Sequence, residues 1–242
     1  MNPTTAMKND VRAGAALFDV GATLLHPCPS VAETFARIAA ERGHGLTVRD
    51  VEPHMPGMEA FYEAEYLRDG DFWCSHEGSV AIWLDQYRYL SHALGIVQDA
   101  EGMAQAVHEA YRRADHWRLY PDVLSCLNGL KERGIALAVV SNWDAELEGL
   151  LRDLELLPYF DLVISSANVG CRKPDPVIFE HALERLNVAS GNAVHVGDRP
   201  DADGDGASAA GIRPLIIDRD GSKAGCGYEC LRSLAEVSRL VA

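Results

Sequence analysis

The sequence lacks any apolar run that approaches the roughly 20 residues needed to cross a bilayer. Its first ten residues, MNPTTAMKND, also lack the apolar core of a signal peptide. Basic residues are scarce, since 22 lysines and arginines stand against 36 acidic residues and give a formal charge of −14. Such a surface repels phosphate backbones and anionic lipids. We therefore expect a cytoplasmic protein that binds neither nucleic acid nor membranes.

Cysteine is also sparse. The six cysteines are widely scattered, and only Cys226 and Cys230 lie close together in the sequence. Their CGYEC spacing matches no zinc-binding pattern. We expect free, mostly buried thiols, as is usual in a reducing compartment.

Strand-like and helix-like segments alternate from about residue 120 onward. Each apolar run ends at a polar or glycine-containing turn, and this alternation favours an α/β fold with a doubly wound parallel sheet. One more strand lies far upstream. The expected strands are Ala15–Phe18, Ile135–Ser141, Leu162–Ser165, Ala193–Gly197 and Pro214–Asp218, and the expected helices are Val123–Arg133, Ala145–Leu156, Pro176–Leu186 and Ala207–Ala210.

The stretch 27–116 contains no comparable strand. Apolar residues recur there at helical spacing instead, as with Val31 and Phe35. This pattern predicts a helical domain inserted after the first strand of an α/β core that is formed by residues 1–26 and 117–242. A length of 242 residues suits such a two-part chain. We expect it to be a monomer or a homodimer.

Polar side chains follow the expected strands. In open parallel sheets, ligands bind beyond the carboxyl ends of the strands, so these side chains are expected at one edge. Each of them alone has an ordinary explanation as a helix cap or a loop residue. Their joint placement on successive strand ends predicts a functional site. The residues are Asp19 and Thr23 after the first strand, Ser141 and Asn142 after the second, Lys173 after the third, and Asp198 and Asp203 after the fourth.

This combination of side chains suits phosphoryl transfer. Asp19 and Asp198 can hold Mg²⁺, which prefers oxygen ligands and usually takes one or two carboxylates. A cation there reduces the repulsion between an attacking carboxylate and the phosphoryl oxygens. Lys173 supplies a second positive charge, and Ser141 donates a hydrogen bond to a phosphoryl oxygen. Asp19 is then free to act as a covalent nucleophile, while Thr23 holds the loop in place.

The ordered segments FDVGAT, VVSN, KPD and HVGDRPDAD, followed by GASAAG, resemble the four motifs of the haloacid dehalogenase superfamily. The resemblance covers nearly the whole chain and points to the branch with a helical cap inserted after the first strand. It implies a Rossmann-like core, a mobile cap, Mg²⁺, and a small phosphorylated substrate that is hydrolysed through an aspartyl-phosphate intermediate. By matching positions, it makes Asp19 the nucleophile. Ser141 and Lys173 become phosphate-binding residues, with Asn142 and Thr23 beside them. Asp198 and the backbone carbonyl of Gly21 become metal ligands, and Asp203 a residue that supports the metal.

One position departs from the pattern of this family. Phosphatases that share the motifs usually carry a second aspartate two residues after the nucleophile, as general acid and base, and here that residue is Gly21. Its loss removes a contribution typically worth about 10² to 10⁴ in rate. Three explanations remain open: a substrate with a good leaving group, a proton supplied by His26 or His76, or a catalytically impaired chain that binds a ligand.

Relatives that lack the second aspartate use other chemistry. Dehalogenases attack carbon and dispense with the metal-binding acids, whereas this sequence keeps Asp198, so 2-haloacid dehalogenation is the least favoured alternative. Phosphonate-cleaving relatives form a Schiff base with a cap lysine, and the stretch 27–116 contains no lysine. The stretch is instead rich in aromatic residues. Trp73, Ser75 and His76, in the polar break GDFWCSHEG, are the expected substrate contacts.

Overall fold

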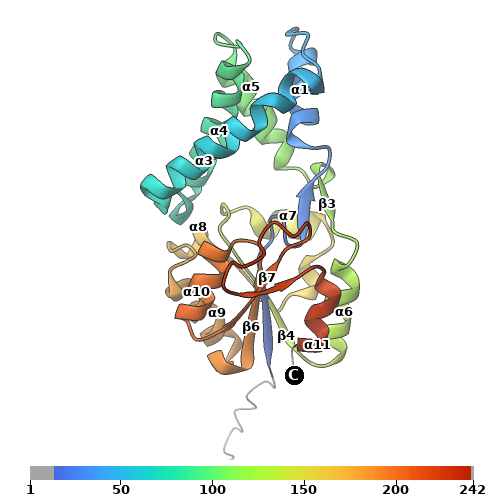
Figure 1. Ribbon diagram of the computed structural model, residues 1–242, viewed down its shortest axis with the longest axis vertical. Coiled ribbons are helices and arrows are strands. Elements are labelled where there is room, and N and C mark those ends of the chain that lie inside the picture. The colour runs from blue at the N-terminus through green and yellow to red at the C-terminus, as the bar shows by residue number, and fades with distance from the viewer. Residues whose placement is uncertain (1–13, 241–242) are drawn as a thin grey trace, which may run out of the picture.

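The computed structural model describes residues 14–240, so the expectation for the first ten residues lies outside the described range. Six parallel strands form the central sheet, which confirms the predicted α/β fold (Figure 1). Their order across the sheet is β5-β4-β1-β6-β7-β8. The strands span Ala15–Phe18 (β1), Ala136–Ser141 (β4), Leu162–Ser165 (β5), Ala193–Gly197 (β6), Arg213–Ile217 (β7) and Glu229–Leu231 (β8).

Helices cover both faces of the sheet because its central strands are apolar on both sides. Alternate residues of a strand point to opposite faces. Ala16 and Phe18 of β1 pack into one core with α6 (Val123–Glu132) and α7 (Leu147–Asp153). Ala15 and Leu17 pack into a second core with α9 (Pro176–Leu186) and α10 (Asp205–Ala209). The short helices α8 (Ser166–Val169) and α11 (Val237–Leu240) complete the two layers. The sheet is therefore doubly wound.

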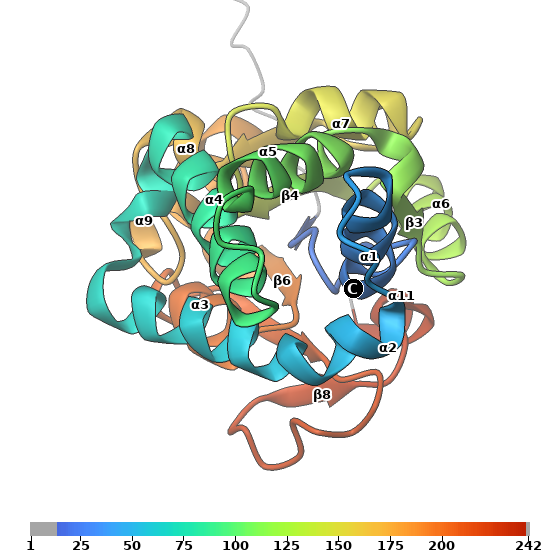
Figure 2. The ribbon, with the colours of Figure 1, turned by 90° about the horizontal axis from the view of Figure 1, so that it is seen from above.

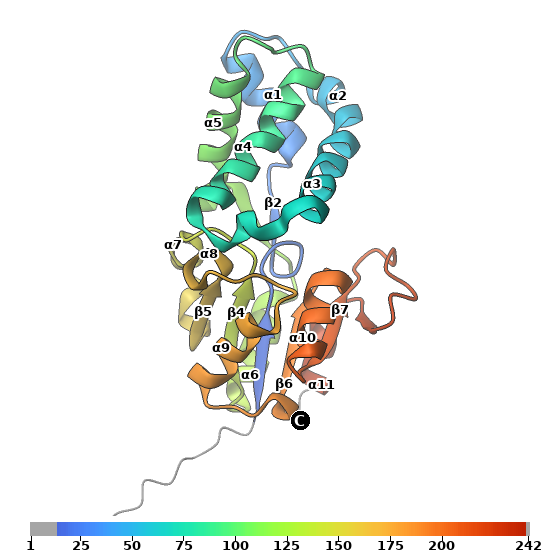
Figure 3. The ribbon, with the colours of Figure 1, turned by 90° about the vertical axis from the view of Figure 1, so that its left-hand side faces the viewer.

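The chain leaves the sheet after β1 through β2 (Leu25–Pro27) and returns through β3 (Trp117–Leu119). These two short strands pair antiparallel. All helices between them lie on the side of the sheet where the strands end (Figures 1 and 3). We call residues 31–111 the helical insert; its standing as a separate domain stays a prediction. Its main helices are α1 (Val31–Glu41), α2 (Val48–Val51), α3 (Met55–Asp69), α4 (His76–Ala93) and α5 (Ala100–Tyr111).

The insert has a hydrophobic core of its own. Phe35 from α1, Leu90 from α4, and Met103 and Val107 from α5 are buried against one another. Ser30 caps the N-terminus of α1, and its side chain accepts the backbone N–H of Glu33 in a capping box. Viewed from above, α3, α4 and α5 lie over the carboxyl edge of the sheet (Figure 2). No helix among residues 14–240 has the length and apolar character that a membrane crossing requires.

The predicted boundaries hold within a residue for the central strands, and three short strands were missed: β2, β3 and β8. Two predicted helices have other bounds than expected: α7 is shorter, and α10 begins at Asp205 instead of Ala207. Helix α7 begins only at Leu147, because the Asp144 carboxylate accepts the backbone N–H of Glu146 at 2.7 Å and holds the preceding residues in a turn. Helix α10 follows a π-helical turn at Pro200–Gly204, which carries part of the acidic segment after β6.

Candidate active site

Asp19 lies at the centre of the carboxyl edge of the sheet. It directly follows β1, which pairs with β4 on one side and β6 on the other. The last residue of β4 is Ser141, and its hydroxyl donates a hydrogen bond to Asp19 Oδ1 at 2.9 Å. Only 7% of the surface of Asp19 is exposed. The strand pairing therefore places a buried carboxylate beside a hydroxyl donor.

Lys173 contributes a cation to the same edge. Its Nζ lies 2.6 Å from Asp19 Oδ1 and 2.5 Å from Asp203 Oδ1, and the residue is 2% exposed. Burial by itself lowers the pKa of Lys173, but the two carboxylates outweigh this effect and raise the pKa above its ordinary value. The ammonium is therefore held fully charged between the two aspartates.

Asp203 accepts hydrogen bonds on both of its carboxylate oxygens. Besides Lys173, His195 Nε2 lies 2.8 Å from Oδ1, and the backbone N–H of Arg199 donates to Oδ2 at 2.8 Å. Burial opposes its charge, yet Lys173 and His195 hold the pKa of Asp203 well below its usual range. A Cβ at Gly197 would lie 2.0 Å from Asp203 Cγ, so only glycine leaves room for this carboxylate at the end of β6.

Asp198 is the third acidic residue at this edge. Burial, together with the charges of Asp19 and Asp203, raises its pKa to about 6. Lys223 Nζ lies 3.2 Å from Asp198 Oδ2 and partly offsets this effect. Oxygen atoms of Asp19, Asp198 and Asp203 lie within 4.8 Å of one another. Hard cations such as Mg²⁺ prefer such oxygen donors, so this set of carboxylates fits a divalent metal.

Asn142, expected as a phosphate-binding residue, lines the cavity described below and also contacts the backbone of Lys173. Its amide nitrogen donates to the Lys173 carbonyl at 3.0 Å, and its amide oxygen accepts the Lys173 backbone N–H at 2.8 Å. The amide oxygen and one N–H of the amide nitrogen are used in this way. Asn142 therefore fixes the loop that carries Lys173.

Four further candidates from the sequence lie outside the large cavity described below. The hydroxyl of Thr23 is buried, and among the described residues it has no hydrogen-bond partner, so the predicted bond that holds the loop is not formed. His26 packs against the ring of Tyr120 with centroids 4.9 Å apart, outside the cavity described below. His76 lines a smaller neighbouring cavity. Ser75 accepts the backbone N–H of Gly78 and thus caps α4.

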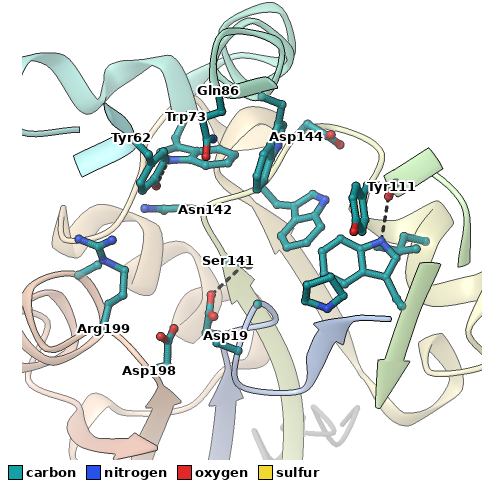
Figure 4. Close-up of a pocket in the computed structure, with 18 of the residues that line it drawn as sticks. Asp19, Tyr62, Trp73, Gln86, Tyr111, Ser141, Asn142, Asp144, Asp198 and Arg199 are labelled. Atoms are coloured by element: carbon teal, nitrogen blue, oxygen red, sulfur yellow. Dashed lines mark hydrogen bonds between the residues drawn. The ribbon is translucent and has the colours of Figure 1, made fainter. Parts of the chain in front are cut away.

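A cavity of about 370 Å³ opens between the sheet and the helical insert. Figure 4 shows Asp19 and Asp198 at its floor and Tyr62, Trp73 and Gln86 at its roof. Gly21, which stands where the family usually has its second aspartate, also lines the cavity. Of the insert residues expected to contact a substrate, the structure brings Trp73 to this cavity.

Direct contacts join the insert to the sheet at the edge of the cavity. Arg199, in the loop after β6, donates two hydrogen bonds to Glu63 of α3, at 2.6 Å and 3.1 Å. The guanidinium of Arg199 also lies over the ring of Tyr66, 4.7 Å from its centroid. The Tyr66 hydroxyl donates to the Lys173 carbonyl at 3.4 Å. Arg199 and Glu63 were not identified from the sequence, although Arg199 directly follows Asp198.

The fold and these contacts define an α/β protein with a buried aspartate at the centre of its sheet, paired with a hydroxyl and an ammonium. A family model described as haloacid dehalogenase-like hydrolase matches residues 13–211. The chain therefore belongs to the haloacid dehalogenase-like hydrolases and is a hydrolase. This finding confirms the resemblance that the four motifs indicated.

Three similar proteins illustrate the range of the family. Haloacid dehalogenase-like hydrolase domain-containing protein 3 of Mus musculus is 34% identical over 83% of this chain and 80% of its own length. Ribulose-1,5-bisphosphate 5-phosphatase of Halopiger xanaduensis is 33% identical, with 85% of each chain covered. The crystal structure of a phosphatase from Thermococcus onnurineus has a TM-score of 0.65 and 24% identity, and the match covers 95% of this chain and 98% of that one. The last likeness concerns the fold alone.

Proposed function

We propose that the chain is a magnesium-dependent phosphatase that hydrolyses a small phosphate ester through an aspartyl-phosphate intermediate on Asp19. The observation that carries this proposal is the meeting of Asp19, Ser141 and Lys173 within hydrogen-bonding distance at one sheet edge. A 33% identical relative that bears the name of a phosphatase supports it. Five cysteines without a disulfide, Cys28, Cys126, Cys171, Cys226 and Cys230, support a reducing, cytoplasmic location.

In the first step, a carboxylate oxygen of Asp19 attacks phosphorus, and the bond from phosphorus to the ester oxygen breaks. The electron pair of that bond leaves with the ester oxygen, which takes a proton from solvent. The ammonium of Lys173 offsets the negative charge of the phosphoryl oxygens, and the Ser141 hydroxyl moves its hydrogen bond from Asp19 to one of them. Water then attacks the acyl phosphate, releases inorganic phosphate and restores Asp19.

Asp19, Asp198 and the backbone carbonyl of Gly21 would hold the Mg²⁺ ion. When bound there, the ion supplies positive charge that lowers the repulsion between Asp19 and the phosphate. In this proposal, Asp203 does not bind the metal directly. Because Lys173, His195 and Arg199 occupy its two oxygens, it aligns Lys173 and supports the metal from a distance.

The test is hydrolysis of acetyl phosphate and p-nitrophenyl phosphate with and without Mg²⁺. We expect turnover that requires the metal and that Asp19→Asn abolishes. Asp153→Asn is the matched control, because Asp153 is exposed on α7, outside the cavity. Halide release from a 2-haloacid without metal would overturn the proposal in favour of dehalogenation.

A second candidate function is ligand binding without catalysis, and Gly21 is the observation that favours it. The cavity contains no second aspartate at that position to protonate a leaving group. Under this alternative, a broad panel of phosphate esters gives no turnover with any divalent metal, while ligands still bind beside Asp19.

A further inference from the structure

We propose that the cavity beside Asp19 takes the organic part of an aryl phosphate, an ester whose alcohol is a flat, uncharged aromatic ring carrying a hydrogen-bond acceptor. This inference rests on the proposed phosphatase function and names its substrate class. Four features of the cavity carry it: aromatic walls, neutralised cations, one unpartnered amide, and the absence of an acid at position 21.

The walls of the cavity are aromatic. All four tryptophans of the chain line it: Trp73, Trp83, Trp117 and Trp143. Their rings contact one another, with centroids 5.8 Å apart between Trp73 and Trp83, 6.4 Å between Trp83 and Trp143, and 5.4 Å between Trp143 and Trp117. Such surfaces stack well on flat aromatic rings. A volume of about 370 Å³ is enough for one or two fused rings beside the phosphate.

The cations that line the cavity already have carboxylate partners. Arg112 donates to both oxygens of Glu146 at 2.7 Å, and Arg199 is paired with Glu63. The third cation, Lys173, belongs to the phosphate end. Burial lowers the pKa of His108, which leaves this lining histidine uncharged at neutral pH. Among the described residues around the cavity, no free cation remains for a second phosphate or a carboxylate, which argues against a negative charge on the organic part of the substrate.

One lining side chain, Gln86 of α4, has an unused donor. The residue is only 5% exposed, and its buried amide nitrogen has no hydrogen-bond partner among the described residues. A buried, unpaired amide N–H costs stability, and a ligand acceptor removes that cost. Most other polar groups nearby are already paired: Trp73 Nε1 donates to the Tyr62 hydroxyl, and Tyr111 donates to the Pro29 carbonyl. One acceptor on the ring therefore suits the cavity better than several sugar hydroxyls.

The leaving group of an aryl ester also suits the chemistry at position 21. A Cβ added to Gly21 would lie 3.6 Å from the ring of Trp143, so an indole stands beside the position usually held by the proton donor. A phenol has a pKa of about 10, far below that of an alkyl alcohol. The phenol oxygen can therefore leave without a proton from a protein acid. When the phosphorus–oxygen bond breaks, the electron pair stays on the phenolate, which takes its proton from solvent.

Binding can be measured apart from turnover, because the four tryptophans give a fluorescence signal from the cavity walls. With Mg²⁺ present, we expect benzylphosphonate, which cannot be hydrolysed, to change this fluorescence and to bind at least about 10-fold more tightly than methylphosphonate. Equal dissociation constants for the two phosphonates would overturn the inference.

Kinetics separate this inference from the proposed function. We expect kcat/KM to rise from glycerol 2-phosphate to phenyl phosphate and again to 1-naphthyl phosphate, with a lower KM for the larger ring. Acetyl phosphate carries no ring and tests the phosphatase alone. Turnover of acetyl phosphate without any preference for aryl esters overturns the substrate class and leaves the phosphatase standing. Tight benzylphosphonate binding without any turnover overturns the phosphatase instead.

Gln86 has a matched control on the same part of the chain. We expect Gln86→Leu to remove the advantage of (4-acetylbenzyl)phosphonate over benzylphosphonate, a loss of about 5- to 10-fold in affinity. Affinity for benzylphosphonate itself should hardly change. Gln98→Leu replaces an exposed glutamine outside the cavity and should retain the full preference. Wild-type preference in Gln86→Leu would contradict the role of this amide.

Discussion

Two hydrogen bonds join the side chain of Asn142 to the backbone of Lys173, one from the amide nitrogen and one to the amide oxygen. Asn142, which directly follows β4, thereby fixes the start of the loop that carries Lys173, and the ammonium of Lys173 reaches Asp19. Arg172 also donates to the same carbonyl at 3.1 Å, so the loss of Asn142 leaves the Lys173 N–H as the unpaired group.

We predict that Asn142→Ala lowers kcat by about 10- to 100-fold, because a small displacement of a catalytic group is costly in rate. The unpaired backbone N–H should also cost about 1 to 3 kcal/mol of unfolding free energy. Kinetics on p-nitrophenyl phosphate and urea unfolding measure the two effects. Asn168→Ala, at an exposed site on α8, serves as the control. A wild-type kcat in Asn142→Ala contradicts the positioning role.

The ion pair of Glu63 with Arg199 joins the helical insert to the sheet at the cavity edge. We predict that Glu63→Gln raises KM several-fold and lowers kcat less, because the pair holds the insert over the site. Its effect on overall stability should be small, about 0 to 1 kcal/mol, since the pair is partly exposed. Added salt should raise KM in the wild type and hardly affect the variant.

Glu59→Gln is the control for this experiment, because Glu59 lies one turn earlier on α3 and is exposed. It should behave like the wild type in both KM and salt response. If Glu63→Gln shows the same KM and the same salt response as Glu59→Gln, the ion pair does not hold the insert in place.

Position 21 offers a direct test of the missing acid. We predict that Gly21→Asp raises kcat/KM on alkyl phosphates, by up to about 10²-fold, and leaves aryl phosphates almost unchanged. The reason is that only the alkyl oxygen needs a proton as it leaves. Gly21→Ala tests the added volume without the acid, and its Cβ fits against Trp143 at 3.6 Å. A large fall in rate with both substrates means that Gly21 has another role.

Asp144 provides a prediction on pH. Burial raises its pKa above the ordinary 3.8, although the Glu146 N–H, His76 and His108 oppose the shift. The folded state then binds the proton more tightly than the unfolded state. The ionised carboxylate therefore destabilises the folded state. This loss of stability develops as pH rises from the ordinary pKa of Asp144 through the raised one.

Asp144→Asn keeps an oxygen to accept the Glu146 N–H and removes the charge. We predict that this substitution raises the midpoint of urea unfolding at pH 7. The gain should disappear at about pH 3, where Asp144 is protonated in both the folded and the unfolded wild type. Equal gains at the two pH values would show that the benefit comes from packing and not from the charge.

Much of the sheet was predictable because its strands are buried on both faces and therefore stand out as short apolar runs. The run that ends at Phe18 places Asp19 at a strand end, and the parallel-sheet rule brings Ser141 and Lys173 to the same edge. The structure puts these three side chains in contact. Their roles in catalysis stay predictions until Asp19→Asn is measured.

Other features depend on contacts between distant segments and leave no local pattern. The strands β2 and β3 are three residues each, and each is defined by a partner about 90 residues away. Arg199 pairs with Glu63 only because α3 lies over the end of β6. The aromatic spacing in α4 predicts a buried helix face, and nothing in it shows that Trp83 and Gln86 face the sheet across a cavity.

The pairing of β2 with β3 has a consequence for how such proteins diversify. Because the chain departs and returns through neighbouring residues, the backbone of the segment from α1 to α5 is connected to the sheet only through β2 and β3. Lengthening, shortening or exchanging that segment leaves the strand order of the catalytic sheet intact. New substrate preferences can therefore arise by grafting at Leu25–Pro27 and Trp117–Leu119, without any change to the residues that perform the chemistry.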